Sequence, residues 1–516
     1  MFSSITSGAV HGIGSYLIQV EVDVSKGLPC FQMVGLLGSE VREARERVKV
    51  ALKNAGTPLP PMCINVSLSP ADLRKEGALF DLPVAVGILE ALEYLPEECT
   101  KNMLIIGELG LNGEVKPVKG VLPIVGKAKE KGITCCIVPR DNALQGAVVQ
   151  GMEIIGVSHL EEALQYLRME ESERKRFIPP LTVDVSALLA GKQKESDLDF
   201  ADVGGQETVK RAAEIAAAGF HHFLMIGPPG SGKTMIAKRM PTILPPLSLE
   251  ESMEVSTIYS IAGLLPPKEV LISSRPFIAP HHNITKQALT GGGKVPSPGM
   301  ATLAHRGILF LDEMAEFKRE TLDSLRQPLE DKKVQIARSN GNYSYPADMM
   351  LVGAMNPCPC GFYPDMHRCG CTPYEVHRYQ ERISGPILDR IDICVETPVI
   401  EMSGLTARIG QESSEQIRSR VMKAREIQQK RFAGTGLRFN TDMSVKEIRK
   451  YCPLGRLEEK MLKQAFDVLH LTARGYHRVL KVARTIADLA GEEQIKEAHL
   501  AEALCYRMPA NRLSGE

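Results

Sequence analysis

One segment of the chain reads Phe223-Leu224-Met225-Ile226-Gly227-Pro228-Pro229-Gly230-Ser231-Gly232-Lys233-Thr234, and a run of helix formers, Met235 to Met240, follows it. From Gly227 onward the segment fits the pattern G-x-x-x-x-G-K-[ST], which requires a strand before it and a helix after it. Both neighbours are present, since the four apolar residues suit a buried strand. The segment therefore predicts a phosphate-binding loop in an α/β domain.

The residue types of this loop match the chemistry of a triphosphate. Glycines let the backbone curl so that successive N–H groups face one anion, and the helix N-terminus adds partial positive charge. Lys233 is expected to reach the β- and γ-phosphates, and the Thr234 hydroxyl to bind Mg²⁺. A plain glycine-rich turn is the alternative. The predicted ATP-binding residues are Gly227, Pro228, Pro229, Gly230, Ser231, Gly232, Lys233 and Thr234.

A second apolar run, Ile308-Leu309-Phe310-Leu311, ends in Asp312 and Glu313. Four apolar residues suit a buried parallel strand, and open α/β sheets bind ligands at the C-terminal ends of their strands. Asp312 is expected to complete the Mg²⁺ shell, and Glu313 to orient or deprotonate the attacking water. Either acid alone would more often be a solvated surface group. Together with the loop, the pair predicts ATP hydrolysis.

The composition sets the broad class of protein. The chain has 516 residues, 44% of them hydrophobic and 24% charged, a formal net charge of zero and twelve cysteines. The length suggests roughly three domains. No apolar run approaches the ~18 residues that cross a bilayer, and the N-terminus lacks the pattern of a signal peptide. We therefore expect a cytoplasmic protein with no membrane contact. Because cytosolic thiols stay reduced, we also expect that the cysteines form no disulfide framework.

Shifts in composition predict four parts of the chain. Residues 1–167 alternate strand-like and helical patterns and form an α+β domain. In that part, residues 40–54 are a predicted helix with Val41, Ala44, Val48, Ala51 and Leu52 inward. Residues 168–200 are charged or polar, contain Pro179-Pro180 and form a linker. Residues 201–400 form the nucleotide domain, and residues 401–516 form a helical lid.

Four further segments resemble AAA+ ATPases. They are the adenine-side entry Asp202-Val203-Gly204-Gly205-Gln206, the sensor-1 strand Met350-Leu351-Val352-Gly353-Ala354-Met355-Asn356, the arginine-finger region Leu388-Asp389-Arg390-Ile391-Asp392 and the sensor-2 segment Thr472-Ala473-Arg474-Gly475. The resemblance implies that Asn356 lies beside the γ-phosphate and that Arg474 acts from the lid. It also implies that Arg390 reaches the ATP of a neighbouring protomer.

An arginine that acts in trans fits the chemistry, because a planar cation stabilises charge on the transferring phosphoryl group. A surface ion pair is the alternative for Arg390, and Arg382 is a rival for the role. If the arginine acts in trans, the active unit is a homo-oligomer, and we expect a hexameric ring.

Two insertions resemble the magnesium-chelatase branch of AAA+ proteins. One is the long stretch 248–306, which contains His281 and His282; we expect these to make packing contacts or contacts of the insert rather than bind metal. The other is a hairpin over 333–345 with its turn at Arg338-Ser339-Asn340-Gly341-Asn342.

The N-terminal part resembles the peptidase domain of Lon proteases, of the S5 domain 2-like fold. The similar segments are 65–83 and 113–120. Leu79 and Leu122 stand where Lon has its serine and lysine, and neither side chain is a nucleophile or a base. Ser67, Ser69 and Lys119 are nearby, but we expect no protease activity and a role in assembly or DNA contact.

The order of a Lon-like domain, a magnesium-chelatase-type ATPase and a helical lid resembles the YifB/ComM family over nearly the whole chain. The resemblance implies an ATP-driven DNA motor, a branch-migration helicase that supports homologous recombination or natural transformation, with branched or single-stranded DNA as its partner. The alternative is a chelatase-like ATPase that remodels a protein partner. No segment of the sequence reads bases, and a motor that grips phosphates needs none.

Four cysteines crowd behind Asn356, namely Cys358, Cys360, Cys369 and Cys371. Four thiolates are the number that a closed tetrahedral Zn²⁺ site takes. The C-x-C spacing is tighter than is usual for such sites, and His367 could replace one cysteine. Four reduced thiols in a loop are the alternative, but exposed thiols are prone to oxidation. We expect a structural zinc that stiffens the path from Asn356 to Arg390.

Overall fold

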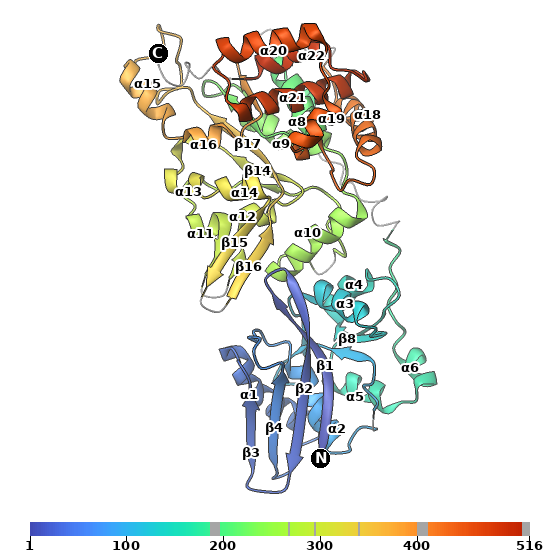
Figure 1. Cartoon of the computed structure of the whole chain (residues 1–516). Helices are drawn as coiled ribbons and strands as arrows, with labels where there is room; N and C mark the ends of the chain where they lie inside the picture. The colour runs from blue at the N-terminus through green and yellow to red at the C-terminus, as the bar shows by residue number, and fades with distance from the viewer. Residues whose placement is uncertain are drawn as a thin grey trace. The chain divides into compact units, whose positions relative to one another are not determined.

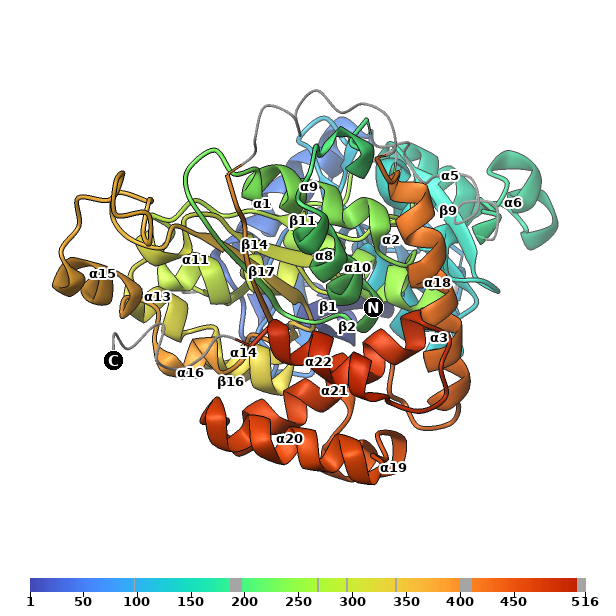
Figure 2. The ribbon, with the colours of Figure 1, turned by 90° about the horizontal axis from the view of Figure 1, so that it is seen from above.

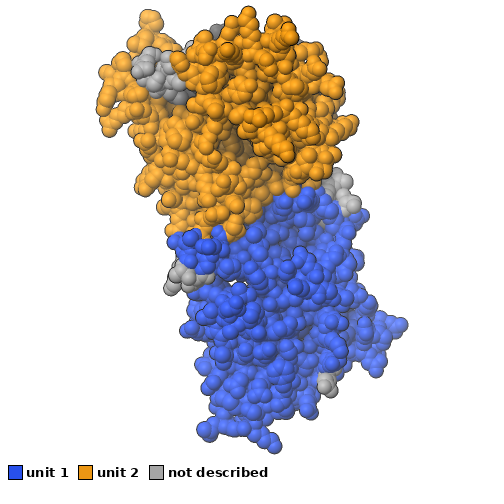
Figure 3. All heavy atoms as spheres, in the orientation of Figure 1, with its two compact units in different colours: residues 1–192, 249–273, 337–343 blue, residues 193–248, 274–336, 344–516 orange. Residues whose placement is uncertain are grey.

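The structure, a computed structural model, describes residues 1–96, 98–185, 197–266, 269–293, 296–338, 341–399 and 411–507 (Figure 1). The chain divides into two compact units. Unit 1 comprises Met1–Lys192, Leu249–Ser273 and Ala337–Tyr343, and unit 2 comprises Gln193–Ser248, Ser274–Ile336 and Ser344–Glu516 (Figure 3).

Unit 1 is built on a seven-stranded mixed sheet with the strand order β3-β4-β2-β1-β5-β8-β9. Its first half is largely antiparallel and its second half parallel. The strands are β1 (Phe2–His11), β2 (Gly14–Ser25), β3 (Cys30–Val34), β4 (Cys63–Ser69), β5 (Met103–Ile105), β8 (Cys135–Pro139) and β9 (Glu153–Val157), with a small pair β6 (Glu108–Leu109) and β7 (Val115–Lys116). Buried and exposed residues alternate along β2, so one face of that strand packs on the core.

The helices of unit 1 are α1 (Ser39–Asn54), α2 (Asp81–Ala91), α3 (Val121–Glu130), α4 (Arg140–Ala147), α5 (Leu160–Arg168), α6 (Glu171–Phe177) and α10 (Leu249–Ala262). In α1 the buried residues are the five that the helical spacing predicted, which confirms that helix. Leu79 and Leu122 are 7% and 1% exposed within the core of the unit. The two leucines that we expect at the positions of the Lon serine and lysine are thus core residues.

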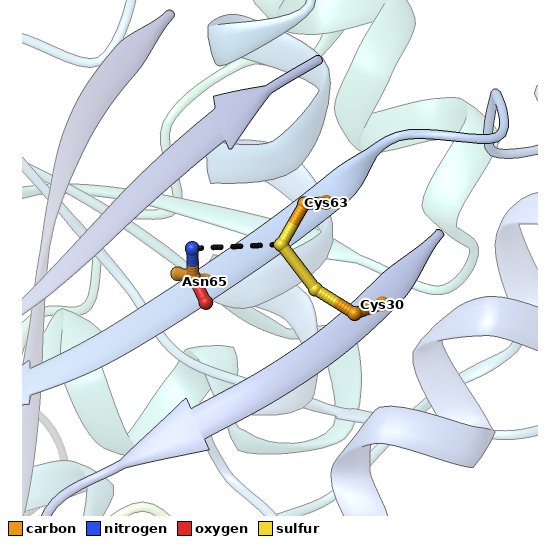
Figure 4. The surroundings of a disulfide bond; sticks show 3 residues. All are labelled: Cys30, Cys63 and Asn65. Atoms are coloured by element: carbon orange, nitrogen blue, oxygen red, sulfur yellow. Dashed lines mark hydrogen bonds between the residues drawn. A yellow bond between two sulfur atoms is a disulfide. The ribbon is translucent and has the colours of Figure 1, made fainter. Parts of the chain in front are cut away.

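One disulfide joins Cys30 on β3 to Cys63 on β4, neighbours across a parallel strand pair (Figure 4). The Asn65 amide also approaches the Cys63 sulfur, at 3.8 Å. We expected no disulfide framework, and this is a single bond, formed where the strand register places the two cysteines directly opposite each other. The other ten cysteines are free.

Unit 2 contains a five-stranded parallel sheet with the order β11-β14-β17-β10-β18. These strands are β10 (Phe223–Ile226), β11 (Phe277–Ile278), β14 (Ile308–Leu311), β17 (Met350–Met355) and β18 (Ile393–Glu396). Phe223 and Met225 pack into one core and Leu224 and Ile226 into another, so both faces of β10 are covered. This explains why the strand is apolar throughout.

The helices before and between these strands are α8 (Glu207–Gly219), α9 (Lys233–Ile243), α11 (Lys286–Thr290), α12 (Met300–Leu303), α13 (Arg319–Asp323), α14 (Arg326–Asp331), α15 (Pro373–Gln380) and α16 (Gly385–Leu388). Short 3-10 turns are η1 (Phe200–Asp202) and η2 (Met314–Glu316). The remaining strands are β12 (Gly291–Gly292) and β13 (Ser297–Pro298), and the predicted hairpin is β15 (Lys333–Arg338) with β16 (Gly341–Pro346). Its predicted turn residues Ser339 and Asn340 lie outside the described residues.

The C-terminal part of unit 2 is helical, as expected for a lid. It comprises α18 (Ser414–Arg431), η3 (Asn440–Asp442), α19 (Val445–Tyr451), α20 (Arg456–Val468), α21 (Ala473–Leu489) and α22 (Glu497–Cys505). Figure 2 shows α20, α21 and α22 side by side, and α18 packs on α8 and α9. The predicted linker contains α6, while residues 186–196 of it lie outside the described part, as do 400–410 and 508–516. Within the described ranges no helix is both long and apolar enough to cross a membrane.

Candidate active site

The phosphate loop connects β10 to α9 at the C-terminal edge of the parallel sheet. Gly230 and Gly232 have φ angles of +78° and +86°, left-handed values that glycine adopts because it has no Cβ atom. A Cβ atom on Gly227 would lie 2.0 Å from Oγ1 of Thr397, so this position admits no side chain. The glycines of the motif are therefore what allow this backbone path.

Lys233 is the first residue of α9 and is 8% exposed. Its Nζ donates to the carbonyl oxygens of Gly227 and Pro228, at 2.7 and 2.8 Å, and lies 3.3 Å from Oδ1 of Asn356. Burial lowers the pKa of Lys233 to about 8, against the opposing charge of Asp312. The ammonium group therefore lies inside the loop, where its hydrogen-bond acceptors are neutral. The charged oxygens of a triphosphate are stronger acceptors and would take their place.

Thr234 and Asp312 meet although they are far apart in sequence. The Thr234 hydroxyl donates to Oδ2 of Asp312 at 2.8 Å, and Asp312 directly follows β14. A hydroxyl and a carboxylate are the hard oxygen donors that Mg²⁺ takes beside phosphates and water. The two side chains therefore fit the Mg²⁺ that the family's chemistry implies.

Glu313 has a φ angle of +51°, and its backbone N–H donates to Oδ1 of Asp312 at 3.0 Å. This turn directs the side chain away from the strand, and the carboxylate is 61% exposed. Its Oε2 lies 3.3 Å from Nδ1 of His282. An accessible carboxylate at this edge can accept a proton from water.

Asn356 directly follows β17, which lies between β14 and β10. Met355 pairs with Ile226, and its carbonyl accepts a hydrogen bond of 3.2 Å from the Gly227 N–H. The parallel register thus brings Asn356 to the base of the phosphate loop.

Arg390 and Arg474 lie elsewhere in unit 2 and share one partner. Arg390 is 8% exposed, and its guanidinium donates to the Pro386 carbonyl at 2.6 Å and to Oε2 of Glu330. Arg474 donates to Oε1 of the same Glu330 at 3.0 Å. Within the described ranges, neither guanidinium bonds to the phosphate loop of its own chain. The rival Arg382 pairs with Glu316 at 2.8 Å and is half exposed.

The cysteine loop gathers its four thiols. The Sγ atoms of Cys358, Cys360, Cys369 and Cys371 all lie within 4.8 Å of one another. Three of the separations are 3.3, 3.5 and 3.8 Å. Backbone N–H groups of Gly361 and Tyr363 also point at the Cys358 sulfur, at 3.2 and 3.4 Å. His367, which could have replaced a cysteine, is not in this group.

The cysteine loop packs on the phosphate loop. Gly361 has a φ of +85°, and a Cβ atom there would lie 2.5 Å from Cδ of Pro229. On its other side the loop leads straight into α15, whose first turn is closed by a capping box between Thr372 and Glu375. Gln380 of α15 donates back to the Pro357 carbonyl at 2.9 Å. The cysteines therefore lie between the phosphate loop and the segment that leads to Arg390.

The structure brings Lys233, Thr234, Asp312, Glu313 and Asn356 together at one edge of the sheet, and it places Arg390 and Arg474 together at another site. Their catalytic roles stay predictions. Sequence reasoning missed His282 as a partner of Glu313. The available signal was its position just after β11, the strand next to β14. It also missed Glu330, for which no local pattern existed.

Three family models match the chain. The model described as magnesium chelatase, subunit ChlI, matches residues 199–405, that of subunit ChlI of Mg-chelatase matches residues 20–142, and that of the subunit ChlI C-terminal part matches residues 411–507. The phosphate loop, Asp312, Asn356 and Arg390 fall in the first of these, and Arg474 in the last.

Curated relatives match over nearly the full length. Competence protein ComM of Haemophilus influenzae is 41% identical over 508 residues, which cover 98% of this chain and 97% of that protein. Protein YifB of Escherichia coli is 40% identical over 507 residues, covering 98% and 97%. Lon protease 2 of Bacillus subtilis is 28% identical over 196 residues, 33% of this chain and 35% of that protein.

Proposed function

Since the chain belongs to the YifB/ComM family of magnesium-chelatase-type AAA+ ATPases, we propose that it is a ring-forming motor that uses ATP to branch-migrate DNA in homologous recombination or natural transformation. The proposal that the motor acts on DNA rests on the 41% identity, over nearly the full length, with a protein named for competence. A motor that acts on DNA in this way would work in the cytoplasm.

The geometry supports a division of labour in hydrolysis. Lys233 would exchange the carbonyls of Gly227 and Pro228 for phosphate oxygens. Glu313 would take the proton of the attacking water, and Asn356 would hold that water or a γ-phosphate oxygen in place. Thr234 and Asp312 would hold the Mg²⁺, which neutralises the developing charge when bound.

The arginines of the site support the proposed assembly. The arginines predicted to complete the centre are all paired with Glu330 or Glu316. In the described part of the structure, Arg390 does not bond to the phosphate loop of its own chain. A cation supplied by the next protomer supports a closed head-to-tail ring, for which we propose six protomers.

The test is an ATPase assay with single-stranded, duplex, forked and four-way-junction DNA. Branched or single-stranded DNA should stimulate turnover, and the wild type should move a junction whereas Lys233→Ala should not. Absence of both DNA binding and stimulation would refute the motor while leaving the ATPase intact. Degradation of casein would refute the prediction that the Lon-like domain has no protease activity.

The match to chelatase models favours one alternative, an ATPase that remodels a protein partner. The same assay separates the two functions. A chain of this second kind would hydrolyse ATP at a rate that no DNA structure changes.

We further propose that the cysteine cluster binds a structural Zn²⁺. Zn–S bonds of about 2.3 Å in a tetrahedron separate the sulfurs by about 3.8 Å. Three of the six separations, 3.3 to 3.8 Å, are close to this value, and all six are within 4.8 Å. Four cysteines leave no open position, so the metal would stiffen the loop beside Pro229 rather than take part in catalysis.

Metal analysis of the purified protein tests the zinc. We expect one zinc per chain in the wild type, none in Cys369→Ser and one in the control Cys505→Ser, since Cys505 is exposed on α22. Less than about half a zinc per chain in the wild type, with unchanged thermal stability of Cys369→Ser, would contradict the proposal.

A further inference from the structure

Glu330, on α14, binds two arginines that come from distant parts of the chain. Arg390 follows α16, and Arg474 lies in the first turn of α21. Each guanidinium takes a different oxygen of the one carboxylate. Two positive charges therefore converge on a single negative charge, and the cluster keeps an excess of one positive charge.

The Arg390 guanidinium is not fully paired. Arg478, one helical turn after Arg474, adds nothing to the excess, because it pairs with Asp392 at 3.5 Å. The Nε of Arg390 is buried and has no hydrogen-bond partner among the described residues. A buried donor without an acceptor is unfavourable, so the group is able to receive a further acceptor.

Of the two contacts of Glu330, the one with Arg474 contributes little as a fold-stabilising ion pair, whereas the Arg390 side chain is only 10% exposed. The Glu330 and Arg474 side chains are 51% and 58% exposed, and exposed pairs gain little because water screens them. Convergence of two planar cations on one anion is, in contrast, how proteins hold a phosphate, whose oxygens accept paired N–H groups.

We propose that Glu330 occupies, in the separate protomer, the place that a phosphate of the neighbouring protomer's ATP takes in the ring. The proposal rests on the proposed function. Arg390 and Arg474 then form one anion-binding pair that acts in trans, and Glu330 is a positioning residue that holds the pair together and is displaced on assembly. Because the carboxylate competes with the incoming phosphate, it raises the protein concentration at which the ring forms.

The experiment measures ATPase rate per protomer as a function of protein concentration at saturating ATP. Glu330→Gln keeps the shape of the side chain but removes its charge. We expect its half-maximal concentration to fall at least threefold, with the plateau rate within about twofold of wild type. The matched control is Glu412→Gln, which removes another half-exposed carboxylate paired with an arginine, Arg420, and should leave the midpoint unchanged.

Two outcomes would overturn the inference. One is a midpoint for Glu330→Gln that is equal to or above that of wild type; the other is an equal fall of the midpoint in the control Glu412→Gln. The pairing has a second test, since residues on one anion are not additive. Arg390→Ala and Arg474→Ala together should lower turnover little more than the worse single change, and multiplied effects would refute the pair. A wild type without ATPase activity would instead refute the proposed function.

Discussion

Replacing Gly361 by alanine tests whether the cysteine loop braces the phosphate loop. The added Cβ atom would lie 2.5 and 2.9 Å from Cδ and Cγ of the Pro229 ring, which cannot rotate away. The backbone at Gly361 is also left-handed, with φ at +85°. The left-handed conformation costs about 1–2 kcal/mol and the overlap about 1–3 kcal/mol, a sum of roughly 2–5 kcal/mol if nothing moves.

The strain is relieved only if the cysteine loop and the phosphate loop move apart. Since about 1.4 kcal/mol corresponds to a factor of ten, we expect kcat/KM for ATP to fall at least tenfold in Gly361→Ala. The control is Gly370→Ala in the same loop, where a Cβ atom meets no atom within 4 Å; it should stay within about twofold of wild type. Steady-state ATPase kinetics and thermal melting compare the two. Equal kcat/KM and equal melting temperature for both variants would refute the bracing contact.

Three further predictions concern other parts of the chain. His282→Ala should lower kcat for ATP by about fivefold with KM unchanged, because loss of the 3.3 Å contact that orients Glu313 should cost about 1 kcal/mol; a change confined to KM would contradict it. Burial lowers the pKa of His222 to about 4, so the folded state resists protonation and stability is lost as pH falls below about 6.5. Urea unfolding should therefore show a loss of about 1–2 kcal/mol between pH 7 and pH 5, and His222→Asn, which keeps an acceptor for the Leu351 N–H, should lose less; an equal loss would refute this cause. Leu122→Ala should destabilise the chain by about 2–5 kcal/mol, because the side chain is 1% exposed, and denaturant melts that match wild type would contradict its place in the core.

The sequence could predict what depends on neighbouring residues. The phosphate loop is a local pattern, so strand, loop and helix follow at their predicted places, and the spacing of α1 identifies its buried face. Asp312 and Asn356 were within reach because each ends an apolar run, and strand ends in a parallel sheet share one edge.

Contacts between distant segments could not be predicted in this way. Glu330 lies 60 residues from Arg390 and 144 from Arg474, so only the packed fold places them together. The pairing of Cys30 with Cys63 depends on strand register, which one sequence does not reveal. The contact of His282 with Glu313 also joins distant segments, since His282 lies in the insert that follows β11 and Glu313 follows β14.

The central claim is that each hydrolytic centre combines the loop of one protomer with Arg390 of the next. Mixing Lys233→Ala with Arg390→Ala tests it, since each variant should be inactive alone. We predict that the mixture recovers about a quarter of the wild-type rate, because about that fraction of sites in randomly assembled rings has an intact loop and an intact arginine. A mixture no more active than the average of the two separate variants would contradict the claim.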